Sequence, residues 1–459
     1  MKHFDAIVIG SGQAGTPLAK KLALAGKNTA IIEKNVVGGT CINVGCTPTK
    51  AMIASAGAAH AARKAGALGI EIGEVKVNLK KIKERKDHIV SSFRGSSEKG
   101  LESTEGLTLL HGEASFTGEK ELLVKLNDGT QEKMTADLIF INVGATPTIP
   151  AIDGSNEIEY LTSSSILDLE EIPQHLVVIG GNYIGLEFGQ MFSRFGSQVT
   201  ILERSERIMS REDEDVSEAM TKIFEDEGIE IVTDMKINKI EKSDQITIQI
   251  TQGNEKRTLK CSHVLVATGR TPQTKALQLQ NCGVAVNDRG YVTVDEKLRT
   301  NVEGIFALGD VKGGPAFTHI SYNDYTIVYR NLFEKTNYTT EDRPMPYCMF
   351  TDPQLGRIGI SESEAKEKNL NIKVAKIPMS EVARGIETNE TLGFMKAIVD
   401  TDTKQILGAS ILAAQGGEIM SVLEMAMEGG ITYDRIRYCV FAHPTYSESL
   451  NNLFMKIED

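Results

Sequence analysis

The chain has 459 residues, of which 41% are hydrophobic and 24% are charged, which is enough for about two to four globular domains. Its formal net charge of −12 argues against nucleic-acid binding, because the phosphate backbone requires a basic surface. No segment reaches the roughly 20 apolar residues that span a bilayer, and the N-terminus lacks a signal-peptide pattern, so we expect a cytoplasmic protein without membrane association.

The first predicted element is a buried strand that leads into a glycine-rich turn and a helix. Gly10, Gly12 and Gly15 have Gly-x-Gly-x-x-Gly spacing, which allows a tight turn, close approach of a pyrophosphate and tight helix packing. The helix N-terminus then directs free N–H groups at the phosphates. A second apolar strand, 29–33, ends in Glu33, the position that binds a ribose hydroxyl in such sites. Together these features predict a dinucleotide site, although the glycines alone would also suit a plain turn.

Two cysteines, Cys41 and Cys46, follow in the chain and can close a small disulfide ring at the start of a helix. The helix N-terminus and the nearby Lys50 would both lower the pKa of a thiol there. A chain with six cysteines in a reducing compartment has no structural disulfide framework, so a close pair is expected to be redox-active or metal-binding. Two buried apolar cysteines are the alternative. A zinc site would need a second Cys or His pair, so no metal site is predicted.

The pattern of strand, glycine turn and helix occurs a second time about 170 residues later, which makes it an internal repeat. Gly180 and Gly185 repeat the first and third glycines, and Glu203 ends the second strand as Glu33 does in the first copy. Asn182 stands at the middle glycine position, where a side chain would crowd a pyrophosphate. The second copy is therefore either a nucleotide site or a degenerate repeat, and the tolerance of asparagine for unusual backbone angles favours the former.

Short alternating segments after each copy are expected to form antiparallel strands, at 122–126, 138–143, 236–240, 246–250 and 264–267. The two copies close on similar turns at Gly144 and Gly269, and a further buried strand ends at Gly309 and Asp310. From about Arg343 onward the pattern is mixed and has no glycine fingerprint, which indicates a separate α+β domain.

The two nucleotide motifs and the cysteine pair indicate electron transfer. A nicotinamide carries a hydride and a disulfide accepts electrons by thiolate exchange, so a flavin is the natural relay between them. We therefore expect FAD in the first site and NAD(P) in the second. The predicted fold is α/β, with two Rossmann-like dinucleotide-binding domains and a C-terminal α+β domain. The predicted boundaries are 1–148 for the FAD domain, 149–270 for the NAD(P) domain, 271–343 for a central part completing the FAD domain, and 344–459 for the last domain.

These features resemble the pyridine nucleotide-disulfide oxidoreductases, which include dihydrolipoamide dehydrogenase, glutathione reductase and mercuric reductase. The resemblance covers essentially the whole chain, and the pattern Gly-Gly-Thr-Cys-x-Asn-x-Gly-Cys-x-Pro-x-Lys at 38–50 is highly specific. It implies that Cys41 is the interchange thiol that meets substrate and that Cys46 is the flavin-proximal thiol of the charge-transfer complex. It also implies that Lys50 pairs with Glu187 beside the flavin.

The same resemblance concerns the C-terminal segment His-Pro-Thr-x-x-Glu. Spacing alone leaves a structural histidine as an equal alternative, whereas the resemblance makes His443 and Glu448 the dyad that protonates the leaving thiol. In the family the partner subunit supplies this dyad, so a homodimer is implied, with 344–459 as the dimerisation domain. Tyr183 would cover the nicotinamide pocket and Asp310 would bind the ribityl or pyrophosphate region of FAD. The predicted cofactor-binding set is Gly10, Gly12, Gly15, Glu33, Gly39, Thr40, Lys50, Gly144, Gly180, Tyr183, Gly185, Glu203, Gly269, Gly309 and Asp310.

The sequence gives fewer indications of which nucleotide and which substrate the protein uses within this family. Glu203 favours NADH over NADPH because a carboxylate repels a 2′-phosphate, although Arg204 and Arg207 could serve one. The segment 381–384 resembles mercuric reductase, but the chain lacks a C-terminal cysteine pair and we expect no metal-binding domain before Met1, which argues against the usual mercury reduction. The segment 313–320 resembles mercuric-reductase-like flavoproteins linked to reactive chlorine resistance and copper(II) reduction.

The sequence thus predicts an FAD enzyme that passes electrons from NADH, or else NADPH, to the Cys41–Cys46 disulfide and then to a small-molecule disulfide. In reverse it would oxidise a dithiol such as dihydrolipoamide. The first alternative is a reductase of Cu(II) or Hg(II). A remote alternative is a non-catalytic FAD-binding partner protein, with Asn182 marking an inactive nicotinamide site.

Overall fold

The structure is a computed structural model that describes residues 1–341 and 343–458. Two compact units are each assembled from separate stretches of the chain. The first comprises Met1–Ala51, Lys83–Thr148 and Gly269–Arg343, and the second comprises Met52–Ile82, Ile149–Thr268 and Pro344–Asp459. The long helices α3 (Cys46–Lys64) and α4 (Leu79–Glu102) carry the chain between the units. Residue 459, on which the predicted last domain ends, lies outside the described residues.

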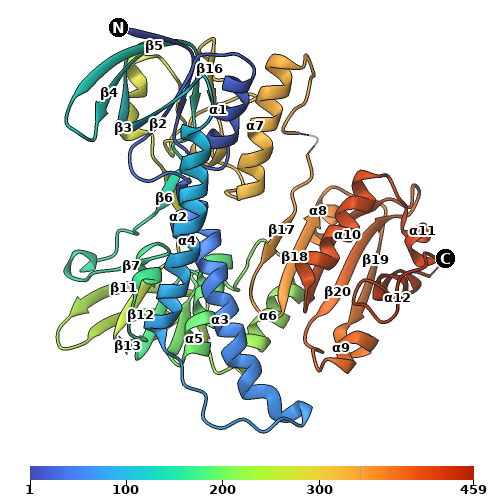
Figure 1. Cartoon of the computed structure of the whole chain (residues 1–459). Coiled ribbons are helices and arrows are strands. Elements are labelled where there is room, and N and C mark those ends of the chain that lie inside the picture. The colour runs from blue at the N-terminus through green and yellow to red at the C-terminus, as the bar shows by residue number, and fades with distance from the viewer. Residues whose placement is uncertain (342, 459) are drawn as a thin grey trace. The chain divides into compact units, whose positions relative to one another are not determined.

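The first unit is built on a parallel sheet. Its strands, in lateral order, are β3 (Leu107–Gly118), β2 (Thr29–Glu33), β1 (Lys2–Ile9), β5 (Gln131–Ile141) and β16 (Ile305–Ala307). Alternate residues of β1 face opposite sides, so Val8 packs against the helices while Ile7 packs against the segment that follows Leu277. The helices are α1 (Gly15–Leu24) and α7 (Thr318–Phe333), which lie side by side in Figure 1.

An antiparallel meander extends one end of this sheet. It consists of the second half of β3, the strand β4 (Glu121–Leu126) and the first half of β5. The predicted strand at 122–126 is confirmed. The predicted antiparallel strand at 138–143 is wrong in direction, because Leu138 to Ile141 pair in parallel with β1. These residues re-enter the central sheet, where burial on both faces suits a parallel strand.

The second unit repeats the arrangement with a five-stranded parallel sheet. Its strands, in lateral order, are β10 (Glu230–Val232), β9 (Gln198–Leu202), β8 (His175–Ile179), β14 (His263–Val266) and β7 (Leu161–Thr162). Helices α5 (Tyr183–Phe195) and α6 (Glu214–Asp226) contribute Phe192 and Phe224 to its core. The predicted antiparallel strand at 264–267 is parallel instead. Its apolar run is fully buried within the sheet, which is typical of a central parallel strand.

Three antiparallel strands follow in the second unit: β11 (Met235–Lys242), β12 (Ile246–Gln252) and β13 (Glu255–Cys261). The strands predicted at 236–240 and 246–250 are confirmed. Two short strands of the first unit, β6 (Ala145–Pro147) and β15 (Arg270–Pro272), pair with each other. They follow directly on Gly144 and Gly269, so the similar turns that close the two copies meet in one small sheet.

The C-terminal part of the second unit is an antiparallel sheet covered by helices. The strands, in lateral order, are β17 (Tyr347–Met349), β18 (Gln354–Gly359), β21 (Ile406–Ala413), β20 (Phe394–Asp400) and β19 (Ile372–Pro378). The helices are α8 (Glu362–Glu367), α9 (Ala383–Glu387), α10 (Gly416–Glu428), α11 (Tyr433–Arg437) and α12 (Ser449–Met455). The α10 helix packs on β18 and β21, and α12 packs on β19. The predicted fold class, two Rossmann-like sheets followed by an α+β domain, is confirmed.

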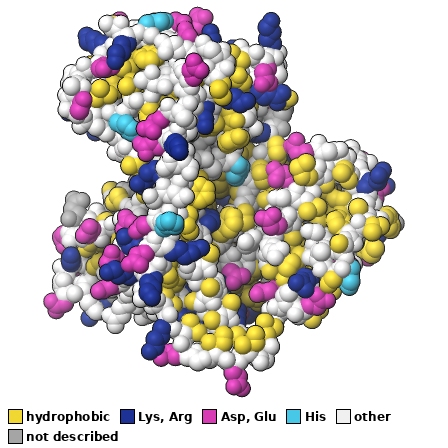
Figure 2. Space-filling model, viewed as in Figure 1, with side chains coloured by type: hydrophobic (Ala, Val, Ile, Leu, Met, Phe, Trp, Pro, Cys, Tyr) yellow, Lys and Arg dark blue, Asp and Glu magenta, His cyan; other side chains and the backbone are white. Residues whose placement is uncertain are grey.

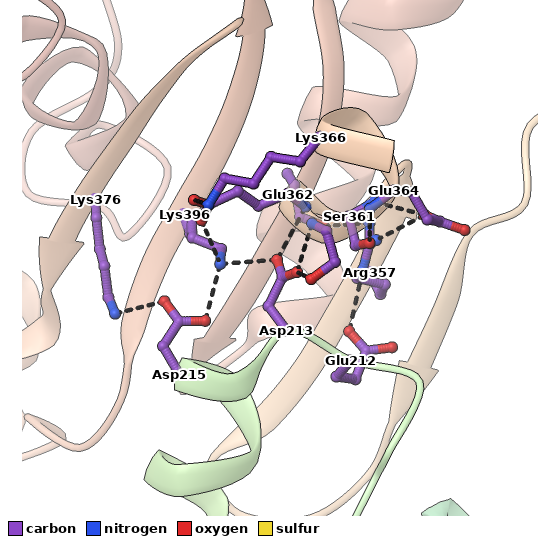
Figure 3. A network of polar contacts seen from close by, with 12 residues as sticks. Glu212, Asp213, Asp215, Arg357, Ser361, Glu362, Glu364, Lys366, Lys376 and Lys396 are labelled. Atoms are coloured by element: carbon purple, nitrogen blue, oxygen red, sulfur yellow. Dashed lines mark hydrogen bonds and ion pairs between the residues drawn. The ribbon is translucent and has the colours of Figure 1, made fainter. Parts of the chain in front are cut away.

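A buried ionic network joins the α6 segment to this C-terminal sheet (Figure 3). Lys396 is only 1% exposed, and its Nζ lies 2.8 Å from Asp213 Oδ2 and 2.8 Å from Asp215 Oδ1. Beside it, Arg357 Nε donates to Glu212 Oε2 at 3.1 Å. Because each buried charge has an opposite partner, the network satisfies groups that would otherwise be costly to bury.

No described helix is long and apolar enough to cross a membrane. On the face shown in Figure 2, acidic and basic side chains are interspersed. Short 3-10 helices complete the secondary structure, at Ala65–Leu68, Ser155–Glu157, Ser165–Asp168, Lys275–Leu277, Leu279–Asn281, Gly309–Lys312 and Met379–Glu381.

Candidate active site

The first glycine motif forms a turn that only glycine fits at two of its positions. Gly10 has φ +102°, and a Cβ atom there would lie 2.3 Å from the carbonyl oxygen of Asn142. A Cβ atom on Gly15 would lie 2.0 Å from the carbonyl oxygen of Gly10. Gly12 differs, because a Cβ atom there would meet nothing closer than Asn142 Nδ2 at 3.3 Å. A Cβ atom at position 12 would thus require only a small shift of one side chain, and close approach of a ligand is a separate reason for glycine there.

The second motif reproduces this geometry at Gly180 and Gly185. Gly180 has φ +117°, and a Cβ atom there would lie 2.6 Å from the carbonyl oxygen of Ala267. A Cβ atom on Gly185 would lie 1.9 Å from the carbonyl oxygen of Gly180. The internal repeat is therefore a structural repeat of the whole turn.

The acids that end β2 and β9 are also held alike. Glu33 Oε2 accepts hydrogen bonds from the N–H and hydroxyl of Ser11, at 3.0 and 2.7 Å, and its Oε1 accepts from Asn35 N at 2.9 Å. Glu203 Oε2 accepts from Gly181 N at 2.8 Å, and its Oε1 accepts from Ser205 N at 2.8 Å. In both copies the carboxylate is fixed beside the glycine turn, where it can accept further hydrogen bonds from ribose hydroxyls.

The two cysteines stand on consecutive helices of the first unit. Cys41 lies in the short helix α2 (Gly39–Val44), and Cys46 is the first residue of α3. Gly45 separates the helices; a Cβ atom there would lie 2.8 Å from the carbonyl oxygen of Thr40. The two thiols hydrogen-bond to each other.

The local electrostatics distinguish the two thiols. A hydrogen bond with Cys46, together with burial and repulsion from a charged Cys46, raises the pKa of the Cys41 thiol well above its usual value. Cys46 stands at the N-terminal end of a helix, where the helix dipole favours a thiolate. The two thiols therefore stand in different surroundings, with Cys41 half-buried against Cys46 and Cys46 at the start of a helix.

Thr318, the first residue of α7, completes the surroundings of the pair. Its Oγ1 lies 3.4 Å from Cys46 Sγ, and its hydroxyl also hydrogen-bonds to Cys41 and lowers the pKa of that thiol. Thr318 was not among the predicted site residues. It is distant from the cysteines in sequence, and a threonine within an apolar segment carries no pattern of its own.

Asp310 follows β16 and lies in a largely buried position. Burial raises the pKa of this carboxyl, although Arg270 and Lys312 oppose the shift. Arg270 Nε lies 3.4 Å from Asp310 Oδ2. No side-chain hydrogen bond to Asp310 occurs within residues 1–341 and 343–458, so its oxygens can accept bonds from a ligand hydroxyl.

The turn that carries Asp310 is anchored by a second carboxylate that sequence reasoning missed. Asp324 of α7 is fully buried, and its Oδ2 accepts a hydrogen bond from Gly309 N at 2.8 Å. Arg343 Nη1 donates to Asp324 Oδ1 at 2.6 Å, and Lys312 Nζ lies 3.3 Å from its Oδ2. The ion pairs compensate the buried charge.

Asn142, just after β5, is another missed residue, and it connects the two turns. Its Nδ2 donates to the carbonyl oxygen of Gly10 at 3.1 Å. A Cβ atom on Gly309 would lie 3.1 Å from Asn142 Oδ1. One side chain therefore contacts both the first glycine turn and the Gly309–Asp310 turn, which sequence spacing alone does not reveal.

The predicted dyad forms a direct contact in the second unit. His443 Nδ1 lies 3.0 Å from both carboxylate oxygens of Glu448. The histidine side chain is 68% exposed, so Nε2 is accessible while Nδ1 faces the acid. A carboxylate on Nδ1 orients the ring and fixes its tautomer.

Comparisons with known proteins show the family of the chain. Residues 4–324 match the family described as pyridine nucleotide-disulphide oxidoreductase, and residues 345–454 match its dimerisation domain. The chain belongs to the pyridine nucleotide-disulphide oxidoreductases. It is therefore an oxidoreductase that couples a pyridine nucleotide to a redox disulfide, as the sequence predicted.

Individual relatives in this oxidoreductase family cover nearly the whole chain. A probable pyridine nucleotide-disulfide oxidoreductase, RclA, from Escherichia coli is 36% identical over all of both chains. Mercuric reductase from Staphylococcus aureus is 34% identical over 97% of this chain and 81% of its own length. A solved structure described as a Cu(II) complex of the HOCl-induced flavoprotein disulfide reductase RclA from E. coli superimposes with a TM-score of 0.91 at 35% identity, over all of both chains.

The family implies a flavin and a pyridine nucleotide, and the residues of the first unit fit FAD. The cradle at Gly12 is open, and Gly39 packs so closely on it that a Cβ atom would lie 2.6 Å from Gly12 Cα. Glu33 stands at the ribose position, and Asp310 has unused acceptor capacity. These residues would hold FAD, which supplies a two-electron carrier between a nicotinamide and a disulfide.

The pairing of Lys50 with Glu187, and the covering of the nicotinamide pocket by Tyr183, stay predictions. Lys50 lies in the first unit and Glu187 in the second. Glu187 is buried, and its Oε1 accepts a hydrogen bond from Phe350 N at 2.8 Å. It lines a cavity of about 380 Å³ together with Gln190, Arg194 and Asp352. Tyr183 is the first residue of α5 and stands beside the second glycine turn.

Two of the other cysteines, Cys261 and Cys282, are buried, and burial raises the pKa of both thiols, which is typical of unreactive structural cysteines. Cys348 is half-buried and Cys439 is exposed. Within the part of the chain that the structure describes, no group of three or more His, Cys, Asp or Glu side chains is placed to hold a metal ion.

Proposed function

We propose that this chain is an NADH-dependent reductase of a small-molecule disulfide. The observation that carries the proposal is the closeness of the thiol pair: Cys41 in α2 hydrogen-bonds to Cys46 at the start of α3, and Thr318 contacts both. Such a pair suits thiol exchange, because two neighbouring sulfurs can close a disulfide once one of them has reacted with substrate.

The thiol chemistry balances with the residues present. His443 takes the proton of Cys41 Sγ as that sulfur attacks one sulfur of the substrate disulfide, and His443 then gives the proton to the leaving sulfur. Cys46 Sγ then attacks Cys41 Sγ, releasing the second substrate thiol and closing the Cys41–Cys46 disulfide. The substrate gains two electrons and two protons, and NADH supplies the two electrons that reopen the protein disulfide. Running in reverse, the same residues would oxidise a dithiol.

The surroundings of Glu203 support NADH over NADPH. Glu203 is fixed beside the second glycine turn, where its negative charge would repel a 2′-phosphate and its oxygens could accept a hydrogen bond from a 2′-hydroxyl. Arg207 does not face that position freely, because its Nη2 donates to the carbonyl oxygen of Glu212 at 3.1 Å. Arg204 is exposed and is the residue that a 2′-phosphate would have to recruit.

We also propose that the enzyme works as a homodimer, with His443 serving the thiols of the partner subunit. The match to the dimerisation domain supports this, and so does the exposure of the residues just before the dyad. Val440 is 94% exposed and Tyr438 is 72% exposed. Large apolar side chains so exposed are typical of an interface.

A second candidate function is reduction of Cu(II), favoured by the similarity to a protein whose structure is described as a Cu(II) complex. Two Cu(II) ions would each take one electron from the thiol pair, giving two Cu(I) ions, the Cys41–Cys46 disulfide and two protons. No leaving thiol needs a proton in this reaction. His443→Ala would therefore spare Cu(II) reduction and abolish disulfide reduction.

The proposal is tested by anaerobic titration of the holoenzyme with NADH and, separately, with NADPH, followed by addition of disulfides such as lipoamide, oxidised glutathione and cystine. We expect NADH to reduce the flavin at a lower concentration than NADPH does. We expect Glu203→Ala to reduce this difference between the two nucleotides. Cys41→Ser should still accept electrons from NADH but fail to pass them to any disulfide. Equal turnover by Cys41→Ser and the wild type would refute the assignment.

A further inference from the structure

The two nucleotide motifs differ at the middle one of their three glycine positions. Asn182 precedes α5 at the position that Gly12 occupies before α1. Its backbone has φ −107° and ψ −179°, an extended conformation that any residue adopts. Asparagine therefore causes no backbone strain there, and what distinguishes the second motif is the side chain.

That side chain caps its own helix. Asn182 Oδ1 accepts a hydrogen bond from Tyr183 N at 2.8 Å, and the Asn182 carbonyl accepts from Leu186 N at 3.0 Å. The first N–H group of α5 is therefore held by a neutral carboxamide of the protein. In the first motif the position that matches Asn182 is Gly12, which has no side chain. No side-chain cap can come from that position in the first motif.

The rest of the second motif remains that of a nucleotide site. Gly180 and Gly185 keep the turn, and Glu203 is held by Gly181 N and Ser205 N as Glu33 is held in the first copy. A degenerate repeat would be expected to lose these features together. Of the three glycine positions, only the middle one is changed, and that is the position expected to approach a bound pyrophosphate.

We propose that Asn182 is an affinity-setting residue of the nicotinamide nucleotide site, whose carboxamide must leave Tyr183 N–H before the pyrophosphate of NADH or NAD⁺ can take that donor. The inference rests on the proposed function, since it assumes that the second motif binds the nucleotide. Asn182 is exposed, so its side chain can swing into solvent without breaking packing. Each binding event therefore exchanges a helix cap for a phosphate contact, and the nucleotide binds more weakly than the motif would otherwise allow.

The expected size of the effect is that of one N-cap. Loss of such a cap typically shifts an equilibrium about fivefold. Asn182→Ala should therefore bind NAD⁺ about fivefold more tightly than the wild type, and Asn182→Gly should gain about twofold or less, since glycine is itself a tolerable N-cap. Asn182→Ser keeps a capping oxygen and should stay within about twofold of the wild type. Asn182→Asp keeps the cap and adds a negative charge facing the pyrophosphate, so it should bind at least about tenfold more weakly.

The experiment is calorimetric titration of the oxidised holoenzyme with NAD⁺, and separately with ADP-ribose, which contains the pyrophosphate but not the nicotinamide. Neither ligand reduces the flavin, so the readout is binding and does not depend on turnover. The melting temperature of each variant is measured alongside to confirm folding. Tighter binding by the Ala variant, with Ser unchanged, supports the proposal.

Three results would overturn it. Equal or weaker binding by Asn182→Gly and Asn182→Ala would mean that the carboxamide assists the pyrophosphate or ignores it. A gain in Asn182→Gly alone would place the effect in the Cβ atom and not in the cap. If the wild type and all variants bind neither ligand, the nucleotide site itself fails, and the proposed function fails with it; the first two results leave that function intact.

Discussion

The Thr318 hydroxyl lies 3.4 Å from the Sγ of Cys46 and also hydrogen-bonds to Cys41, so one side chain of α7 contacts both thiols of the redox pair. A hydroxyl that donates to a thiolate stabilises the charged form and lowers the pKa of the thiol. Thr318 is therefore expected to control how readily Cys41 ionises in the reduced enzyme.

Thr318→Val should raise the pKa of Cys41 further, because it removes a group that lowers it. The thiolate fraction at a fixed pH then falls, and alkylation of Cys41 by iodoacetamide should slow about three- to tenfold at pH 8, equivalent to a pKa shift of about half a unit to one unit. The rate is followed from pH 6 to 10 by mass spectrometry of the Cys41 peptide. Because the pKa is already raised in the wild type, its rate should keep rising through the alkaline range. Thr318→Ser is the matched control, and a Val variant that reacts like the wild type would exclude this role.

The His443–Glu448 contact predicts that loss of the dyad slows reduction of the substrate disulfide but not reduction of the flavin by NADH. His443→Ala should lower disulfide turnover about 10²-fold or more, because a positioned acid typically contributes 10²- to 10⁴-fold, and Glu448→Ala should have a smaller effect in the same direction. Reduction of the flavin by NADH should be unchanged in both variants. His111, which lies 3.6 Å from Glu98 on the first unit, offers a matched histidine–carboxylate control. If His111→Ala and His443→Ala behave alike, the dyad has no catalytic role.

Substitutions at Gly12 and Gly15 are expected to have different effects, one on cofactor binding and the other on folding. A Cβ atom on Gly15 would lie 2.0 Å from a backbone oxygen, whereas one on Gly12 would meet only Asn142 Nδ2 at 3.3 Å. Gly15→Ala should therefore destabilise the protein even without FAD, by about 1–3 kcal/mol. Gly12→Ala should leave the melting temperature of the apoprotein nearly unchanged and weaken FAD binding at least about tenfold, since the methyl group enters the pyrophosphate approach. Fluorescence titration of the apoprotein with FAD measures the second effect. Normal FAD affinity in Gly12→Ala would contradict the assigned cradle.

Local patterns were sufficient for the parts of the site that are close in sequence. The glycine motifs, Glu33, Glu203 and the cysteine pair were predicted because each follows from spacing within one strand–turn–helix unit. Asn142 and Thr318 were missed because they reach the site only through the sheet and through α7. The direction of β14 was predicted wrongly for a related reason: an apolar run shows that a strand is buried but not whether its neighbours are parallel.

The buried network around Lys396 predicts an acid-sensitive contribution to stability. Burial alone would raise the pKa of Asp213, but hydrogen bonds from Lys396 and from the backbone of Ser363 and Glu362 hold it below its usual value of 3.8. A carboxyl whose pKa is lowered by folding stabilises the protein above its unfolded pKa, and that contribution is lost as the pH falls through the folded pKa.

Asp213→Asn should therefore lower the urea midpoint by a constant amount between about pH 5 and 8, and the difference from the wild type should shrink below about pH 4. Lys396→Ala should cost about 3–5 kcal/mol near neutral pH, because it leaves buried carboxylates without their cation. Asp226→Asn is the control, since its partner Lys222 is 77% exposed and such pairs contribute about 1 kcal/mol or less. A difference between Asp213→Asn and the wild type that persists unchanged to pH 3 would show that the Asp213 charge is not the source of the stabilisation. In that case the hydrogen bonds to Ser363 and Glu362, which an asparagine oxygen can partly retain, would have to be tested separately.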